Sequence, residues 1–178
     1  MSEVSSDLSR RLADLRSGFD AAFARPSAEA AKDSVGLLLL RLGTERYALR
    51  VTELSDVVAA CKVVPLPGSR PELLGIAGVR GRFVPVYSLA SLVGGPSSPS
   101  WSWIAICGSE EALGLTFDTL EAYVQVAPAD LVAATSGDGS GGHVREVLRK
   151  DGTLAAVIST ASIVGSIKSR AQGPREGH

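Results

Sequence analysis

The sequence predicts an all-β protein built from small barrels, with an N-terminal amphipathic helix in front of them. Short apolar segments separated by Gly- and Asp-containing turns recur between residues 35 and 158, which is typical of strands in small barrels. No long helical pattern follows residue 34. Hydrophobic residues make up 45% of the chain and charged residues 21%, a balance typical of a soluble globular domain.

The N-terminal segment has the periodicity of a helix. Its large apolar residues recur every three or four positions, which places them on one helical face: Leu8, Leu12, Leu15, Phe19 and Phe23. This spacing predicts an amphipathic helix over 5–24, begun by Ser6 or Asp7 and ended before Pro26. Because apolar helical stripes are usually buried, the helix is expected to pack on the domain or to self-associate, and a free arm that docks on a partner is the alternative. With the linker 25–34, it forms an N-terminal unit, residues 1–34.

The next residues predict a hairpin, followed by a short segment that tolerates a helix. Residues 35–51 contain two apolar segments on either side of the turn Gly43-Thr44-Glu45-Arg46, as in a β-hairpin. Residues 52–60 tolerate a helix, in which Asp56 lies outside the apolar face. The apolar positions on that face are Leu54, Val57 and Val58.

Proline and glycine punctuate the central stretch, residues 64–94, which holds four of the nine prolines. At its centre, Arg80 and Gly81 form a turn between two strand-like segments, and Gly81 can adopt the positive φ that a tight turn requires. Arg80 and Arg82 are two positions apart, so on a strand their side chains would point to the same face. Arg80 is either a solvated turn residue or an anchor for a partner protein, since arginine is enriched at such anchors.

The second half repeats the hairpin pattern after a connector at 94–100. Strands are predicted at 101–107, 112–117 and 123–126, and a further hairpin over 144–158 turns at Lys150-Asp151-Gly152. Trp101 and Trp103 share a strand face, either in the core or as an exposed interface. A short helix or a turn is predicted for 160–167, and the tail, 168–178, is expected to be disordered.

The residue types argue against most catalytic and metal-binding functions. A net charge of −1 argues against nucleic-acid binding. Cys61 and Cys107 form no CxxC pair, which suits a reducing cytoplasmic compartment, and the N-terminus carries no signal-peptide core.

His143, in a glycine-rich loop, is expected to be solvated and lacks an orienting partner for a triad. The loop 137–142 matches neither a phosphate-binding nor a calcium-binding loop, so no cofactor or metal is expected. A small-ligand or enzyme domain that uses this loop is the alternative from another class.

Residues 65–89 read PLPGSRPELLGIAGVRGRFVPVYSL, and this stretch resembles the central pattern of a known family. The pattern runs approximately Pro-Leu-Pro-x-x-Pro-x-x-Leu-x-Gly-Val-x-Asn-x-Arg-Gly-x-x-x-Pro-Val-x-Asp-Leu and belongs to the CheW-like coupling proteins of bacterial chemotaxis. The segments 42–49, 55–58 and 115–118 also resemble family segments in the same order. The resemblance covers about residues 35–167, which would form the CheW-like domain.

The resemblance implies two intertwined five-stranded SH3-like barrels without enzyme activity or cofactor. It implies an adaptor that links the cytoplasmic hairpin tip of a chemoreceptor to the regulatory domain of a CheA-type histidine kinase. Other CheW-like proteins are further partners, whereas nucleic acid and direct membrane insertion are not expected. The implied location is the cytoplasm, with recruitment to receptor clusters.

The resemblance also implies where partners bind. The receptor-groove residues, carried over by position, are Asp56, Val57, Val79, Arg80 and Gly81. Kinase contact is expected at apolar barrel surfaces. Further interface candidates are Arg82, Trp101 and Trp103.

The chain departs from the family pattern at two positions. Gly78 stands where the family has Asn, and Ser88 stands where it has Asp. An Asn side chain can fix a turn by bonding to nearby backbone, so both changes are expected to loosen the groove around Arg80. They favour the alternative of a divergent member that binds a receptor or another coupling protein but not the kinase.

Overall fold

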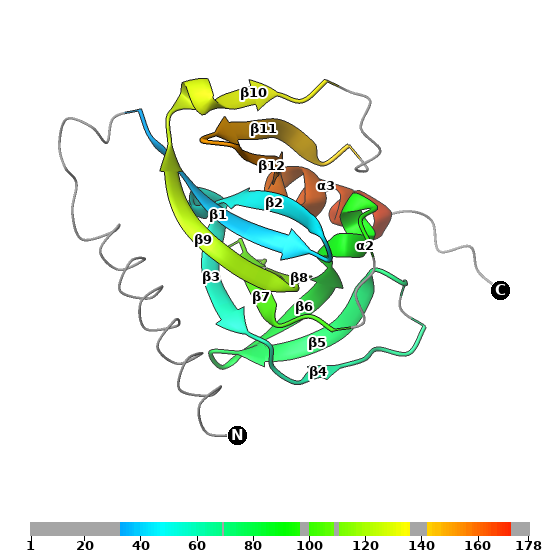
Figure 1. The fold of residues 1–178 in the computed structure, drawn as a ribbon. Helices are drawn as coiled ribbons and strands as arrows, with labels where there is room; N and C mark the ends of the chain where they lie inside the picture. Colours follow the sequence, from blue (N-terminus) through cyan, green and yellow to red (C-terminus); the bar gives the residue numbers. More distant parts are fainter. Residues whose placement is uncertain (1–32, 69, 97–99, 109–110, 136–141, 172–178) are drawn as a thin grey trace, which may run out of the picture.

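The computed structural model describes residues 33–68, 70–96, 100–108, 111–135 and 142–171 (Figure 1). The predicted N-terminal helix, residues 136–141 of the glycine-rich loop and residues 172–178 of the tail lie outside the described residues. Within them the chain is mostly β, as predicted, and its strands form two six-stranded sheets. No helix in the described part of the chain is long and apolar enough to cross a membrane.

The first sheet, called sheet I, contains strands from both ends of the described chain. Its order is β10-β11-β12-β2-β1-β9, and all neighbours are antiparallel except the parallel pair β12 and β2. The strands are β1 Val35–Leu42, β2 Glu45–Arg50, β9 Thr119–Val126, β10 Leu131–Ala133, β11 Val144–Lys150 and β12 Thr153–Ile158.

Sheet II is formed by the continuous middle of the chain. Its order is β3-β7-β8-β6-β5-β4, with β6 and β8 parallel. The strands are β3 Leu54–Ala59, β4 Val63–Val64, β5 Leu73–Val79, β6 Arg82–Ser88, β7 Trp103–Cys107 and β8 Leu113–Phe117. The chain therefore begins in sheet I, builds all of sheet II and returns to sheet I. The resemblance implied five strands in each barrel, whereas each sheet contains six, of which β4 and β10 are only two and three residues long.

Each sheet curls around a core of its own. In sheet I, Val126 of β9 and Leu131 of β10 come from opposite edges of the sheet and pack in one cluster with Leu37, Ala48 and Val157. In sheet II, Val58 of β3 and Val63 of β4 also come from opposite edges and pack against one cluster. The two edges of each sheet therefore approach each other across its interior.

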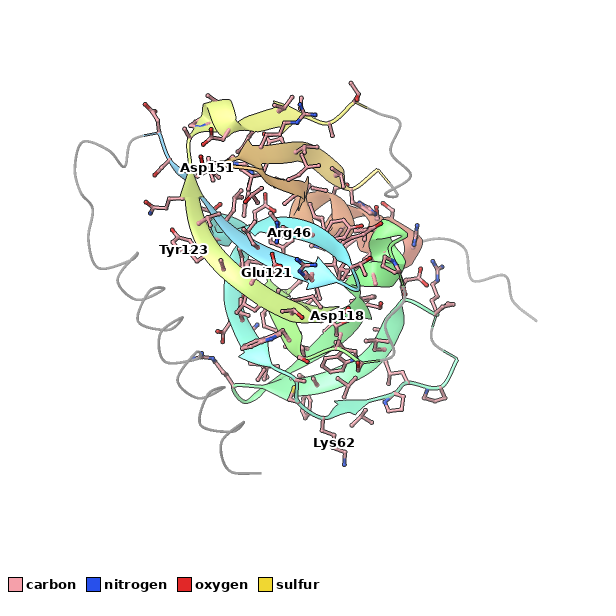
Figure 2. The ribbon with its side chains drawn as sticks, viewed as in Figure 1. Arg46, Lys62, Asp118, Glu121, Tyr123 and Asp151 are labelled. Carbon is pink, nitrogen blue, oxygen red and sulfur yellow. The ribbon has the colours of Figure 1, made fainter. Side chains whose placement is uncertain are left out.

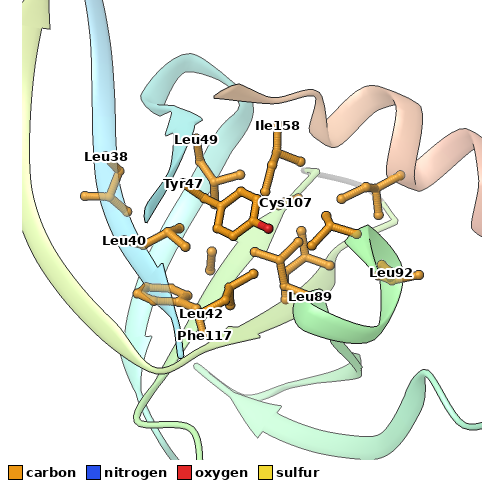
Figure 3. Packing of buried hydrophobic residues seen from close by; sticks show 14 of the residues in the cluster. Leu38, Leu40, Leu42, Tyr47, Leu49, Leu89, Leu92, Cys107, Phe117 and Ile158 are labelled. Carbon is orange, nitrogen blue, oxygen red and sulfur yellow. The ribbon is translucent and has the colours of Figure 1, made fainter. Parts of the chain in front are cut away.

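A third cluster, called the junction core, joins the two sheets (Figure 3). Leu38, Leu40 and Leu42 reach it from β1, while Leu37 and Leu39 point the other way into the core of sheet I. Because β1 is buried on both faces, its sequence is a continuous apolar run rather than an alternating one. Sheet II contributes residues such as Leu115 and Phe117.

Two α-helices border the junction core. The helix α2, Leu89–Val93, was not predicted, although Ser88 caps its start and Gly94, at φ 69°, ends it. The helix α3, Thr160–Ala171, was predicted, but it extends four residues beyond 167, so residues 168–171 do not belong to a disordered tail. Single 3-10 turns lie at Val51–Glu53 and Pro128–Asp130.

Two local predictions were wrong. Residues 54–59 form strand β3 instead of a helix, because they pair along β7. The first hairpin turn contains only Gly43 and Thr44, because Leu42 pairs directly with Glu45. Glu45 and Arg46 therefore belong to β2.

A charged cluster joins three strands of sheet I at the turn between β1 and β2 (Figure 2). Glu121 on β9 accepts hydrogen bonds from Arg46 on β2, with Nε at 2.5 Å, and from Arg41 on β1. Burial raises the pKa of the Glu121 carboxyl, but the hydrogen bonds and charges of Arg46 and Arg41 outweigh this effect and lower the pKa overall. The cluster connects three strands across the β1–β9 bulge at Leu39 and Leu40.

Candidate protein-interaction site

The central turn between β5 and β6 consists of Arg80 and Gly81. Val79 pairs directly with Arg82, so the turn has two residues, with φ values of 48° and 77°. Two positive φ values are characteristic of a type I′ hairpin turn. Asp151 and Gly152 make the same kind of turn between β11 and β12. An arginine at positive φ is uncommon, and such strained residues concentrate at functional sites.

Arg80 forms an ion pair with Asp56, which lies on the edge strand β3 and is separated from β6 in the sheet by β7 and β8. The Arg80 side chain is 67% exposed and the Asp56 side chain 22% exposed. Asp56 Oδ1 accepts a hydrogen bond from the Val57 backbone N–H at 2.9 Å. Asp56 Oδ2 is buried and forms the ion pair with Arg80 Nε; within the described residues it has no further hydrogen-bond partner.

The structure thus brings together three of the five predicted groove residues, Asp56, Arg80 and Gly81. Val57 is half-buried and packs against the junction core. Val79 is buried in the core of sheet II, so its side chain holds the turn on the sheet and offers little surface.

The two tryptophans do not share a strand face. Trp101 precedes β7 and packs against the core of sheet II, whereas Trp103 lies in β7 and packs against the junction core. Both are half-buried, so the core-packing interpretation fits them.

An open groove of about 310 Å³ lies between β6, the start of β8 and α3. Arg82, the third interface candidate, lines it together with Phe83 and Pro85 from β6 and Val164 and Ile167 from α3. Lys168 of α3 forms an ion pair with Glu111, and both of these residues also line the groove. The groove therefore has apolar walls with charged residues of both signs.

The two departures from the family pattern have different consequences. Ser88 accepts a hydrogen bond from the Ser91 backbone N–H at 3.2 Å and caps α2. Ser and Asp are comparable N-cap residues, so Ser88 keeps the helix cap that an Asp could make at this position. Gly78 lies opposite Phe83 in the β5–β6 ladder, and a Cβ added there would meet nothing within 4 Å.

His143 is buried, which corrects the expectation of a solvated loop residue. The residue is 5% exposed, and its Nδ1 lies 2.9 Å from Ser162 Oγ of α3. No carboxylate of the described residues hydrogen-bonds to His143, so the His–Ser contact lacks the third member of a triad. Nor does that part of the chain contain a group of three or more residues suited to hold a metal ion.

Burial, with a smaller contribution from the charge of Arg170, lowers the pKa of His143 below its usual 6.5. The unfolded state therefore binds a proton more readily, and the stability that neutral His143 provides is fully present above pH 6.5. We expect the urea midpoint to fall as the pH drops below 6.5 towards the folded-state pKa. His143→Asn keeps a polar atom near Ser162 and should flatten this dependence. An equal slope in both proteins would contradict the assignment.

Sequence reasoning missed the contacts that join α3 to the residues just before β3 and β5. Glu53 Oε2 accepts hydrogen bonds from the Thr160 backbone N–H at 3.0 Å and from the Thr160 hydroxyl. At the other end of the helix, Arg170 Nη1 donates to Glu72 at 2.9 Å. These partners lie 107 and 98 positions apart in the sequence. A pattern of neighbouring residues cannot predict such pairs.

Comparison with known proteins is consistent with the predicted family. The family model described as CheW-like domain matches residues 36–168. A search of curated proteins finds no match. The chain is similar to the crystal structure of the scaffolding protein TtCheW from Thermoanaerobacter tengcongensis, with a TM-score of 0.66 and 19% identity, over 70% of this chain and 88% of that one. Because the family model covers most of the chain, the protein belongs to the CheW-like family.

Proposed function

We propose that the protein is a non-catalytic adaptor in a chemosensory array, located in the cytoplasm and recruited to receptor clusters. It links the cytoplasmic hairpin tip of a chemoreceptor to a CheA-type histidine kinase. Membership of the CheW-like family and similarity to a protein named as a scaffold support this role. The two curled sheets are then the SH3-like barrels of the family.

The observation that carries the receptor assignment is the Asp56–Arg80 ion pair at an exposed strained turn. Asp56 holds the guanidinium near β3 through one nitrogen, and Arg80 remains largely exposed. A guanidinium has further N–H donors for a carboxylate or backbone carbonyl of a partner. Val57, the next residue on β3, packs against the junction core and supports the strand that carries Asp56.

Arg80→Ala is expected to weaken binding of a chemoreceptor hairpin tip. Loss of a charge-assisted contact costs about 1.5–3 kcal/mol, which corresponds to a roughly 10- to 150-fold higher Kd. Isothermal titration calorimetry with the full chain measures this change. Arg149→Ala, an exposed arginine on β11 of sheet I, is the matched control and should leave Kd unchanged. Equal affinities of the Arg80→Ala protein and the wild type would reject the assigned site.

A second function is a divergent adaptor that binds a receptor or another coupling protein but not the kinase. Gly78 favours it, because the exposed position opposite Phe83 carries no side chain where the family has Asn. Titration with the isolated kinase regulatory domain distinguishes the two functions. A defined binary complex would reject the divergent version.

A further inference from the structure

One face of sheet II is covered over only half of its width. On β7 and β8, the side chains of this face enter the junction core, among them Ala105, Leu115 and Phe117. On β6, Tyr87 of the same face packs against that core. On β5 and β4, no element of the described residues continues this cover.

The uncovered part is apolar, and we call Val64, Ile76, Phe83 and Pro85 the open apolar face. Val64 pairs with Ile76, and Ile76 pairs with Pro85, so they form one row across β4, β5 and β6. Phe83 lies two positions before Pro85 on the same face and is 87% exposed, and Val64 is 55% exposed. The intervening residues of β5 and β6 point into the core of sheet II. A face of this kind is a site for an apolar partner.

The open apolar face has the width of one helix. Neighbouring strands lie about 4.8 Å apart, so β4 and β6 are about 10 Å apart. The helix α3 already lies beside β6 across the groove that Phe83 and Pro85 share with Val164 and Ile167. Packed helices lie about 8–10 Å apart, so a second helix beside α3 would cover β5 and β4. Gly78 leaves space next to Phe83 for a large side chain.

We propose that the occupant is the N-terminal segment of this same chain, residues 5–24. Its sequence places five large apolar residues on one helical face, from Leu8 to Phe23. A helix of this length extends about 30 Å, enough for the stripe to cover Phe83 and the row behind it. Phe19 or Phe23 suits the space left by Gly78.

The linker is long enough for docking within one molecule. The ten residues 25–34 precede β1 and span up to about 33 Å when extended. A compact domain with a radius of gyration of about 14 Å is about 36 Å across, so the linker and the helix of about 30 Å are together long enough to reach the open apolar face from the start of β1. A second copy of the chain is not required.

Hydrogen exchange of the full chain, followed by mass spectrometry, tests the proposal. In the wild type we expect amides of residues 8–24 to exchange at least about tenfold more slowly than in an unprotected peptide. Phe83→Asp should abolish this protection, since it places a charge in the middle of the face. Phe83 is exposed, so the fold should survive, and near-ultraviolet circular dichroism checks this.

Leu154→Asp is the matched control, because Leu154 is also exposed but lies on β12 of sheet I. Protection of 8–24 that persists in Leu154→Asp and disappears in Phe83→Asp supports the proposal. Absent protection in the wild type, or equal protection in both variants, overturns it. Protection that rises with protein concentration, with a dimer by light scattering, also overturns it in favour of a second copy. Receptor binding is not used as a readout, so a failure here is distinct from a failure of the Arg80 assignment.

Discussion

Gly75→Ala is expected to be among the most destabilising single substitutions in this protein, by roughly 3 kcal/mol or more. Gly75 has a φ of 146°, and a Cβ there would lie 2.1 Å from the carbonyl oxygen of Val64 and 2.9 Å from Cα of Pro65. Both are backbone atoms, so no side-chain rotation can relieve the contact. The β5–β6 register also shifts between Leu73 and Gly75, which fixes the glycine at the point where β4 crosses closest.

Urea unfolding tests this expectation by comparing the free energies of unfolding of Gly75→Ala and Gly78→Ala, two substitutions on the same strand, β5. Gly78 has open space where a Cβ would be placed, and glycine inside a strand is itself unfavourable by about 0.5–1 kcal/mol relative to alanine. We therefore expect Gly78→Ala to be neutral or slightly stabilising. Equal losses of unfolding free energy in the two variants would show that the close approach of β4 is not the cause.

Glu53→Ala is expected to lower the free energy of unfolding by about 2–3 kcal/mol. The substitution removes a charged acceptor of two hydrogen bonds, each worth about 1.5–3 kcal/mol when one group is charged. It also leaves the donors of the buried Thr160 without this partner. Because Glu53 lies between the sheets and Thr160 begins α3, exchange of the α3 amides should accelerate along with the global loss.

Two variants make the Glu53 result specific. Glu53→Gln keeps an acceptor oxygen but loses the charge, and should be less destabilising than the alanine variant. Glu111→Ala removes an exposed carboxylate that also pairs with α3, through Lys168, and exposed ion pairs contribute little. A loss of stability in Glu111→Ala as large as in Glu53→Ala would contradict the role assigned to Glu53.

Local signals in the sequence predicted the hairpins, because turn residues and flanking apolar segments are neighbours in the chain. The segment 54–59 carries no such local signal. Val57 packs against the junction core and Val58 against the core of sheet II, so β3 has adjacent apolar residues instead of alternation. Its strand partner β7 begins more than forty positions later, and helix and strand cannot be told apart from such a short apolar segment alone.

The candidate site was only partly accessible from the residues themselves. The Arg80 turn was visible as a glycine-containing turn, but Asp56 was singled out through the family resemblance. Their contact depends on the curling of sheet II, which brings β3 to the β5–β6 turn. Glu53 and Thr160 had no local signal, because their contact exists only after the chain has returned to sheet I.

The route of the chain sets an order for its synthesis on the ribosome. Strands β1 and β2 are made first, but β12, the parallel neighbour of β2, ends only at Ile158. The last strand of sheet II to be made ends at Phe117. Sheet II can therefore pair its strands before β11 and β12 of sheet I have been made. A nascent chain that stops before β11 can therefore cover the β1 face that enters the junction core, but it exposes the opposite face, with Leu37 and Leu39, which packs against Leu148 and Val157 in the complete protein. Such exposed strands favour aggregation, and we expect truncated chains of this length to depend on chaperones far more than the complete protein.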